Sequence, residues 1–269
     1  MSRLRPARRL ALAAIVVAVL AAPGAAALAA PAGPSSTSSQ ARAAAPAANQ
    51  RVDRASPVGA PDPEMARRML ACTPCHGKEG RATSAGYFPR IAGKPAGYLF
   101  NQLVNFREGR RPNSAMADLV EHLDDAYLRD IAAYFAALDL PYAPPSAGVV
   151  APALLARGEG LARQGYAQRN VPACIACHGE RLTGVLPSLP GLAGLPRDYL
   201  LGQLGAWREG DRRAVAPDCM ATIARRLDAA DIEAVTLWIA AQPPGADMRP
   251  AAAGTLKWPL PVACGSAPP

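Results

Sequence analysis

Cys72-Thr-Pro-Cys75-His76 and Cys174-Ile-Ala-Cys177-His178 are two copies of one pentapeptide, Cys-x-x-Cys-His, 102 residues apart. In this pattern the two cysteines attach a porphyrin through thioether bonds, and the histidine binds its iron. A methionine follows each copy, Met116 40 residues after His76 and Met220 42 residues after His178. Because both copies lie in matching stretches of about a hundred residues, we expect two covalently bound haem c groups.

The segments that follow the two motifs repeat in the same order. The matching pairs are Pro89–Pro95 with Pro190–Pro196, Tyr98–Leu103 with Tyr199–Leu204, and Phe106–Gly109 with Trp207–Gly210. The offset is 101 through these pairs and 104 at the methionines, so the second half gains three residues between Gly210 and Met220. We expect this insertion to lie in a surface loop.

Apolar residues at three- and four-residue spacing predict helices throughout. Asp62 precedes a proline and is a plausible N-cap for the first of them. The expected helices are 63–71, 98–107, 124–138, 153–164, 197–208 and 228–241. No convincing alternating strand is present, and Pro/Gly-rich loops separate the helices. The pattern predicts an all-α fold.

The N-terminus resembles a secretory signal peptide. Residues 1–30 combine four arginines, an apolar run of 13 residues from Leu10 to Ala22, and small residues suited to cleavage. A membrane span needs roughly 20 apolar residues, so membrane association is expected only if this segment stays uncleaved. Residues 31–61, rich in Ala, Pro and Ser, predict a disordered linker. Two domains, 62–145 and 150–243, and a tail, 244–269, complete the predicted organisation.

The net charge argues against nucleic acid as a partner. Removing the signal peptide lowers the formal charge from +8 to +4, because this segment holds four arginines and no acidic residue. Two haems would add four carboxylates and bring the total near neutrality. No basic block interleaved with aromatic residues remains.

The order of these motifs resembles the cytochrome c4 family, a tandem pair of class I cytochrome c domains. The resemblance covers residues 63–243 and includes both Cys-x-x-Cys-His-Gly motifs, both Pro-x-x-Ala-Gly loops and the last helix with Tyr134-Phe135. It implies two helical haem domains related by pseudo-two-fold symmetry. It also implies that a proline carbonyl accepts the ring N–H of each motif histidine. Pro89 fits this role in the first half, whereas Pro187 and Pro190 both remain candidates in the second.

The candidate haem-binding residues have alternative roles, in zinc binding or in packing, and the sequence bears on the choice. A Cys₄ zinc ribbon would place its two Cys-x-x-Cys pairs roughly 15–20 residues apart, which these are not. His76 and His178 are therefore expected as proximal iron ligands, with Met116 and Met220 as distal ligands in polar loops. Packing is the alternative use of those methionines. His122, the remaining histidine, is expected to be solvated.

Cys219 and Cys264 lie outside the haem motifs and occur only in the second half. In an exported protein two such thiols suggest a disulfide, which would hold the tail beside Met220. Two free cysteines are the alternative.

The leading functional hypothesis is a periplasmic dihaem cytochrome that carries single electrons in a respiratory chain. Its donor would be a membrane or periplasmic redox protein, such as a cytochrome complex or a dehydrogenase complex of which it could be the electron-accepting subunit. Its acceptor would be a protein such as a terminal oxidase. His/Met ligation leaves no open iron position, so the chain is not expected to be an enzyme. The alternative, a dihaem peroxidase or small-molecule oxidoreductase, needs a labile distal ligand. The haems are expected to differ in potential because of residues 211–219.

Overall fold

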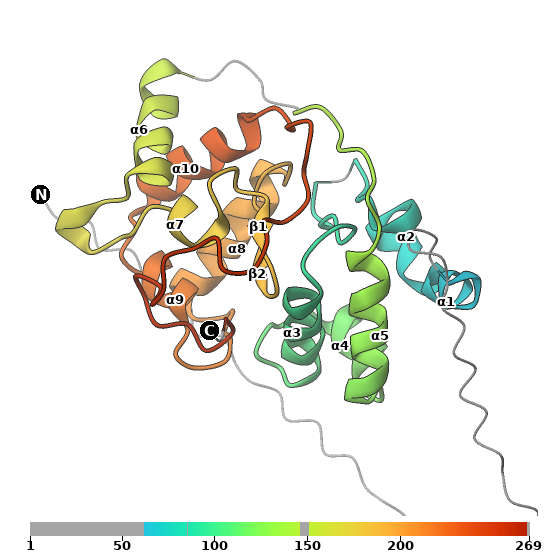
Figure 1. Cartoon of the computed structure of the whole chain (residues 1–269). Helices are drawn as coiled ribbons and strands as arrows, with labels where there is room; N and C mark the ends of the chain where they lie inside the picture. The colour runs from blue at the N-terminus through green and yellow to red at the C-terminus, as the bar shows by residue number, and fades with distance from the viewer. Residues whose placement is uncertain (1–61, 85, 146–150, 268–269) are drawn as a thin grey trace, which may run out of the picture. The chain divides into compact units, whose positions relative to one another are not determined.

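The computed structural model describes residues 62–84, 86–145 and 151–267 (Figure 1). The predicted signal peptide and linker, residues 1–61, lie outside the described residues. The described chain has two halves, residues 62–145 and 151–267. Each half is built mainly from helices, as the sequence predicts.

The first half contains helices α1 to α5. Asp62 begins α1, because its side chain accepts the backbone N–H of Glu64 at 3.0 Å. Asp124 caps α5 in the same way, accepting the N–H of Tyr127 at 2.8 Å. The elements are α1 (Pro63–Arg68), the 3₁₀ turn η1 (Met69–Cys72), α2 (Thr73–His76), η2 (Lys78–Gly80), α3 (Ala96–Arg107), α4 (Ser114–Val120) and α5 (Asp125–Ala136).

The second half follows the same order with additions. Its elements are α6 (Pro152–Arg163), η3 (Ala167–Arg169), α7 (Ile175–His178), β1 (Gly184–Val185), β2 (Leu189–Pro190), α8 (Arg197–Glu209), α9 (Cys219–Ala224) and α10 (Ala229–Ala241). The two strands pair antiparallel, Gly184 opposite Pro190 and Val185 opposite Leu189. This short hairpin was not predicted, because two-residue strands are too brief for an alternating pattern.

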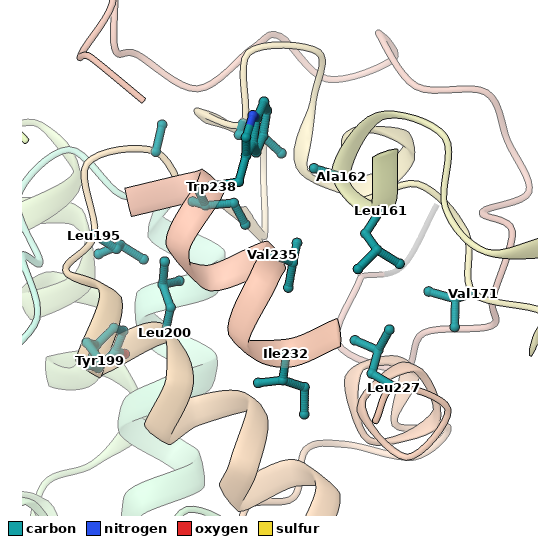
Figure 2. Packing of buried hydrophobic residues seen from close by; sticks show 13 residues of the cluster. Leu161, Ala162, Val171, Leu195, Tyr199, Leu200, Leu227, Ile232, Val235 and Trp238 are labelled. Atoms are coloured by element: carbon teal, nitrogen blue, oxygen red, sulfur yellow. The ribbon is translucent and has the colours of Figure 1, made fainter. Parts of the chain in front are cut away.

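Each half has its own hydrophobic core. In the first, Leu128, Ile131 and Phe135 of α5 pack with Leu99 and Phe106 of α3. Met69 is buried in this core and Met65 packs against it. In the second, a row of residues on α10 meets α6 and α8 (Figure 2). Its members include Ile232, Val235 and Trp238 of α10, Leu161 of α6, and Tyr199 and Leu200 of α8.

The contact between α6 and α10 is close because Gly158 has no side chain. A Cβ atom on Gly158 would lie 2.2 Å from the carbonyl oxygen of Ala234 and 2.6 Å from Cβ of Trp238. Both distances are shorter than van der Waals contact, so α6 and α10 can approach this closely only because residue 158 is glycine. Gly160 lies two residues further along α6, and a Cβ atom added there would have nothing within 4 Å.

Of two expectations about the region before the last helix of each half, one was wrong and one agrees with the structure. Met116 lies in helix α4 and Met220 in helix α9, not in loops. Polar N-caps, Asn113 and Asp218, start these helices, and their short length hid them from a periodicity search. The insertion before Met220 lies in the loop between α8 and α9, after Arg212, where residues 213 and 215–217 are exposed, as expected of a surface loop.

Candidate haem sites

Each Cys-x-x-Cys-His motif forms a single helical turn that ends at glycine. Gly77 and Gly179 follow the histidines with φ values of 74° and 81°, a region that favours glycine. A Cβ on Gly77 would also lie 2.3 Å from the carbonyl oxygen of Ala82. The chain therefore turns sharply behind each histidine, which holds the two cysteines and the ring together on one short element.

The two motif histidines are oriented by the same hydrogen bond. Nδ1 of His76 lies 2.9 Å from the carbonyl oxygen of Pro89, and Nδ1 of His178 lies 2.7 Å from that of Pro190. A carbonyl can only accept, so Nδ1 carries the proton and Nε2 keeps a free lone pair for a metal. The geometry assigns Pro190, and not Pro187, to this role in the second half.

Burial keeps both imidazoles neutral. Desolvation lowers the pKa of His76 and of His178, although each backbone hydrogen bond to proline opposes the shift. Neutral imidazole is the form that binds iron. Desolvation also raises the pKa of the Cys72 and Cys177 thiols, and it raises the pKa of the Cys174 thiol to about 11.

The two motifs differ in exposure. Cys75 of the first half is exposed, whereas its counterpart Cys177 is partly buried. His178 is only 7% exposed and His76 is partly buried. The first site therefore presents one edge of its motif to solvent.

The structure brings no zinc-type cluster together. Across residues 62–84, 86–145 and 151–267, no three or more His, Cys, Asp or Glu side chains converge as metal ligands. The two Cys-x-x-Cys pairs belong to separate halves with separate cores, Cys72 packing against the first and Cys174 against the second. The zinc-ribbon alternative is thus not supported by the arrangement.

The methionines proposed as distal ligands are partly buried and stand at different positions of their helices. Met116 donates its own backbone N–H to the Asn113 cap at 3.0 Å. In the second half the equivalent donor to Asp218 is Ala221, also at 3.0 Å, and Met220 comes one residue earlier. One residue corresponds to about 100° around a helix, so the two methionines differ by about this angle in their position relative to their caps.

The other residues that the sequence analysis named are exposed, packed in a core or joined in a disulfide. His122 has a side chain that is 89% exposed and lies 3.2 Å from Glu121, in agreement with a solvated histidine. Tyr134 packs against the first core, edge-on to Phe135. Cys219 and Cys264 form a disulfide with an S–S distance of 2.11 Å.

A buried polar network links the two halves. Arg111 donates to Tyr199 and Gln203 of the second half, both at 2.9 Å, and Arg212 donates to Gln102 of the first at 2.7 Å. Tyr98, Gln102 and Arg111 correspond to Tyr199, Gln203 and Arg212 at the repeat offset of 101, so the network is pseudo-symmetric. The sequence carried this signal as repeated polar residues, but only the structure shows that they meet.

This network supplies a test of whether the site suits haem. Its two guanidinium groups have no carboxylate among their hydrogen-bond partners in the described residues. Nε of Arg212 and Nε1 of Trp207 are buried N–H groups without an acceptor there. Arg212 stacks over the Trp207 ring, 3.7 Å from its centroid. Unpaired buried donors and cations are costly, and haem propionates are acceptors of the required charge. The residues present fit the group.

Lys94 is a further buried cation that the sequence did not reveal. It belongs to the first half, is 4% exposed, and donates to the carbonyl oxygen of Gly191 in the second half at 3.0 Å. Desolvation, followed by the charge of Arg90, lowers the pKa of Lys94 to about 7. Its counterpart in the repeat is Leu195, so only one of the two sites has this amine beside its proline loop.

Known proteins match this chain along most of the described region. A thiosulfate dehydrogenase electron acceptor from Thiomonas intermedia is 38% identical over 173 residues, which cover 64% of this chain and 79% of the relative. Cytochrome c4 from Pseudomonas aeruginosa is 34% identical over 174 residues, covering 64% and 84%. No protein-family model matches the chain.

Two solved structures are similar. Reduced cytochrome c4 from Pseudomonas stutzeri superposes with a TM-score of 0.56 at 34% identity, covering 67% of this chain and 98% of that one. A thiosulfate dehydrogenase from Marichromatium purpuratum gives a TM-score of 0.57 at 35% identity. The match covers 64% of this chain but only 36% of that protein.

The fold and the two motifs define an all-α c-type cytochrome with two haem c groups, an electron carrier and not an enzyme. The chain belongs to the cytochrome c4 family. The relatives, named as cytochrome c4 or as an electron acceptor, do not favour the peroxidase alternative. Among the described residues no helix is long and apolar enough to cross a membrane.

Proposed function

We propose that this cytochrome accepts electrons from a dehydrogenase of small sulfur compounds and passes them singly to a further redox protein. Two relatives are named as electron acceptors of thiosulfate dehydrogenase, and the structural match to a thiosulfate dehydrogenase points the same way. A dehydrogenation releases two electrons, and two haems in one chain can take both.

The ligand assignment carries this function. His76 and Met116 would bind the first iron, and His178 and Met220 the second, with Cys72, Cys75, Cys174 and Cys177 as thioether anchors. The haem supplies the Fe(III)/Fe(II) couple. The single observation that supports the assignment most directly is the pair of Nδ1 to proline carbonyl hydrogen bonds, which leaves Nε2 of both histidines available. A thioether ligand favours Fe(II) and so raises the potential.

We place the protein in the periplasm. The predicted signal peptide supports export, and the Cys219–Cys264 disulfide suits an oxidising compartment. The terminal oxidase suggested by the sequence stays a proposal for the acceptor.

The experiment mixes the oxidised dihaem protein with a thiosulfate dehydrogenase and thiosulfate, and follows the reduced haem bands by stopped flow. We expect both haems to be reduced only when enzyme and thiosulfate are present together. No reduction under these conditions would reject this donor. A peroxide-turnover assay on the same preparation is expected to show no activity above that of free haem.

The ligands are tested separately. Met116→Leu and Met220→Leu should each remove half of the methionine–iron(III) charge-transfer band and lower one of the two potentials. A variant with an unchanged redox titration would refute that methionine as a ligand.

A further inference from the structure

The C-terminal segment after α10, residues 244–267, runs back across the second half; we call it the C-terminal strap. Ala251 pairs with the β1–β2 hairpin, donating to the Gly184 carbonyl and accepting from Leu186, both at 2.9 Å. Leu260 and Ala267 are buried, 8% and 4% exposed. A segment rich in proline and alanine is therefore fixed along its length by backbone pairing and apolar contacts.

The end of the strap holds the residues just before Met220. Cys264 is bonded to Cys219, the first residue of α9, and Gly265 donates to the carbonyl oxygen of Pro217 at 2.9 Å. Gly265 fits so closely that a Cβ there would lie 2.3 Å from the carbonyl oxygen of Ala216. Of the three residues before Met220, Pro217 and Cys219 are thus bonded to the strap.

The strap also reaches the first half. Asn101 of α3 donates from its side-chain amide to the carbonyl oxygen of Ser266 at 3.1 Å. Because Asn101 lies on the same helix as Tyr98 and Gln102, the strap ends beside the polar network that joins the halves. One short segment therefore touches α9, the preceding loop and α3.

The first half has no equivalent device among its described residues. Met116 is tied directly to its own cap, since its N–H donates to Asn113. Met220 has no such bond: the cap Asp218 accepts from Ala221 and from Ala214. The position of Met220 depends more on what holds Cys219 and Pro217.

We propose that Cys219 and Cys264 are positioning residues for Met220, and that the strap sets the redox potential of the second haem. The proposal rests on Met220 being the distal ligand. Both cysteines are partly exposed, so a dithiol can reach the bond. In that reaction each cysteine sulfur gains one electron and one proton, and the dithiol becomes a cyclic disulfide. Release of the strap then loosens Met220 and lowers the second potential.

The test compares Cys264→Ser with Asp247→Asn in the complete dihaem protein. Asp247 also belongs to the strap, but it lies near the start of the strap, far in sequence from Cys264, and pairs with Arg181 and Arg249. We expect Cys264→Ser to weaken the methionine–iron(III) charge-transfer band by up to half and to lower one of the two potentials. Asp247→Asn should change neither. An unaltered band and unaltered potentials in Cys264→Ser would overturn the proposal.

A second measurement guards against a variant that does not fold. The unmodified protein is reduced with a dithiol, alkylated at the two freed thiols, and reoxidised at the haems before its spectrum and titration are recorded. The same loss of band is expected. Met220→Leu separates the two ideas: if it leaves both potentials unchanged, the ligand assignment fails. If it lowers one potential while strap cleavage does not, only the role of the strap is rejected.

Discussion

Arg111 of the first half donates a hydrogen bond to the hydroxyl of Tyr199 in the second half at 2.9 Å. Burial alone would raise the pKa of Tyr199, but the guanidinium groups of Arg111 and Arg212 lower it. The contact is therefore charge-assisted, and it lies at the centre of the network that joins the two halves.

Replacing Tyr199 with phenylalanine should weaken this junction. The variant removes the acceptor and leaves a buried guanidinium N–H unpaired, which costs about 1–3 kcal/mol of unfolding free energy. Urea unfolding followed by circular dichroism measures the change. Tyr87→Phe is the control, because Tyr87 is 67% exposed and its loss should matter little. Equal effects of the two substitutions would contradict the proposed importance of the network.

The helix pair α6–α10 permits a matched test within one helix. Gly158→Ala should destabilise the protein by about 1–3 kcal/mol, because the added methyl meets the Ala234 carbonyl at 2.2 Å. Gly160→Ala meets nothing within 4 Å and should stabilise by about 0.5–1 kcal/mol through helix propensity. Thermal unfolding of the two variants measures both changes in stability. The same sign for both would show that α6 and α10 are less closely packed than described.

Asp231 carries an ionic cluster at the start of α10. Its carboxylate is 1% exposed and pairs with Arg157 at 2.6 Å and Arg169 at 2.9 Å, while also closing a capping box with Asp228. Asp231→Asn should cost about 1.5–3 kcal/mol, because it weakens charge-assisted hydrogen bonds to two arginines whose side chains are themselves 45% and 38% exposed.

The matched control for Asp231 is in the first half. Asp125 pairs with Arg107 at 2.6 Å but is 50% exposed, so Asp125→Asn should cost about 1 kcal/mol or less. Chemical denaturation of both variants at one salt concentration provides the comparison. Similar losses would mean that burial of Asp231 contributes nothing.

Lys94 should make stability depend on pH. Its folded pKa of about 7 lies below its ordinary value of 10.5, so between these values the unfolded chain binds a proton that the folded chain lacks. Stability therefore rises with pH across this window, and the dependence levels off below about pH 7, where both states bind the proton. Lys94→Met should flatten the dependence, as urea titrations at about pH 7 and 9 would show. An equal slope in both proteins would exclude Lys94 as its source.

Much of this molecule follows from its sequence. Apolar spacing located the long helices, and Asp62 caps the helix that it precedes, as predicted. These features succeed because they depend on neighbours in sequence. The short helices that carry Met116 and Met220 escaped notice, since one or two turns give too few positions for a period.

Contacts between distant residues could not be predicted. Lys94 looks like a solvated lysine in a Pro/Gly-rich loop, yet it is buried against Gly191, 97 residues away. Pro187 and Pro190 were equally plausible acceptors until the ring of His178 was placed. Such outcomes depend on how two cores and their loops meet, which one-dimensional patterns do not encode.

The strap has a consequence for the order in which the chain can be completed. The contacts that fix the start of α9 come from residues 264–266, and Cys264 follows Cys219 by 45 residues in sequence. During synthesis α9 is therefore made before the residues that hold it, and its start can be fixed only after they have followed. A variant without residues 264–266 would keep both Cys-x-x-Cys-His motifs and both methionines, yet the start of α9 would lose these contacts.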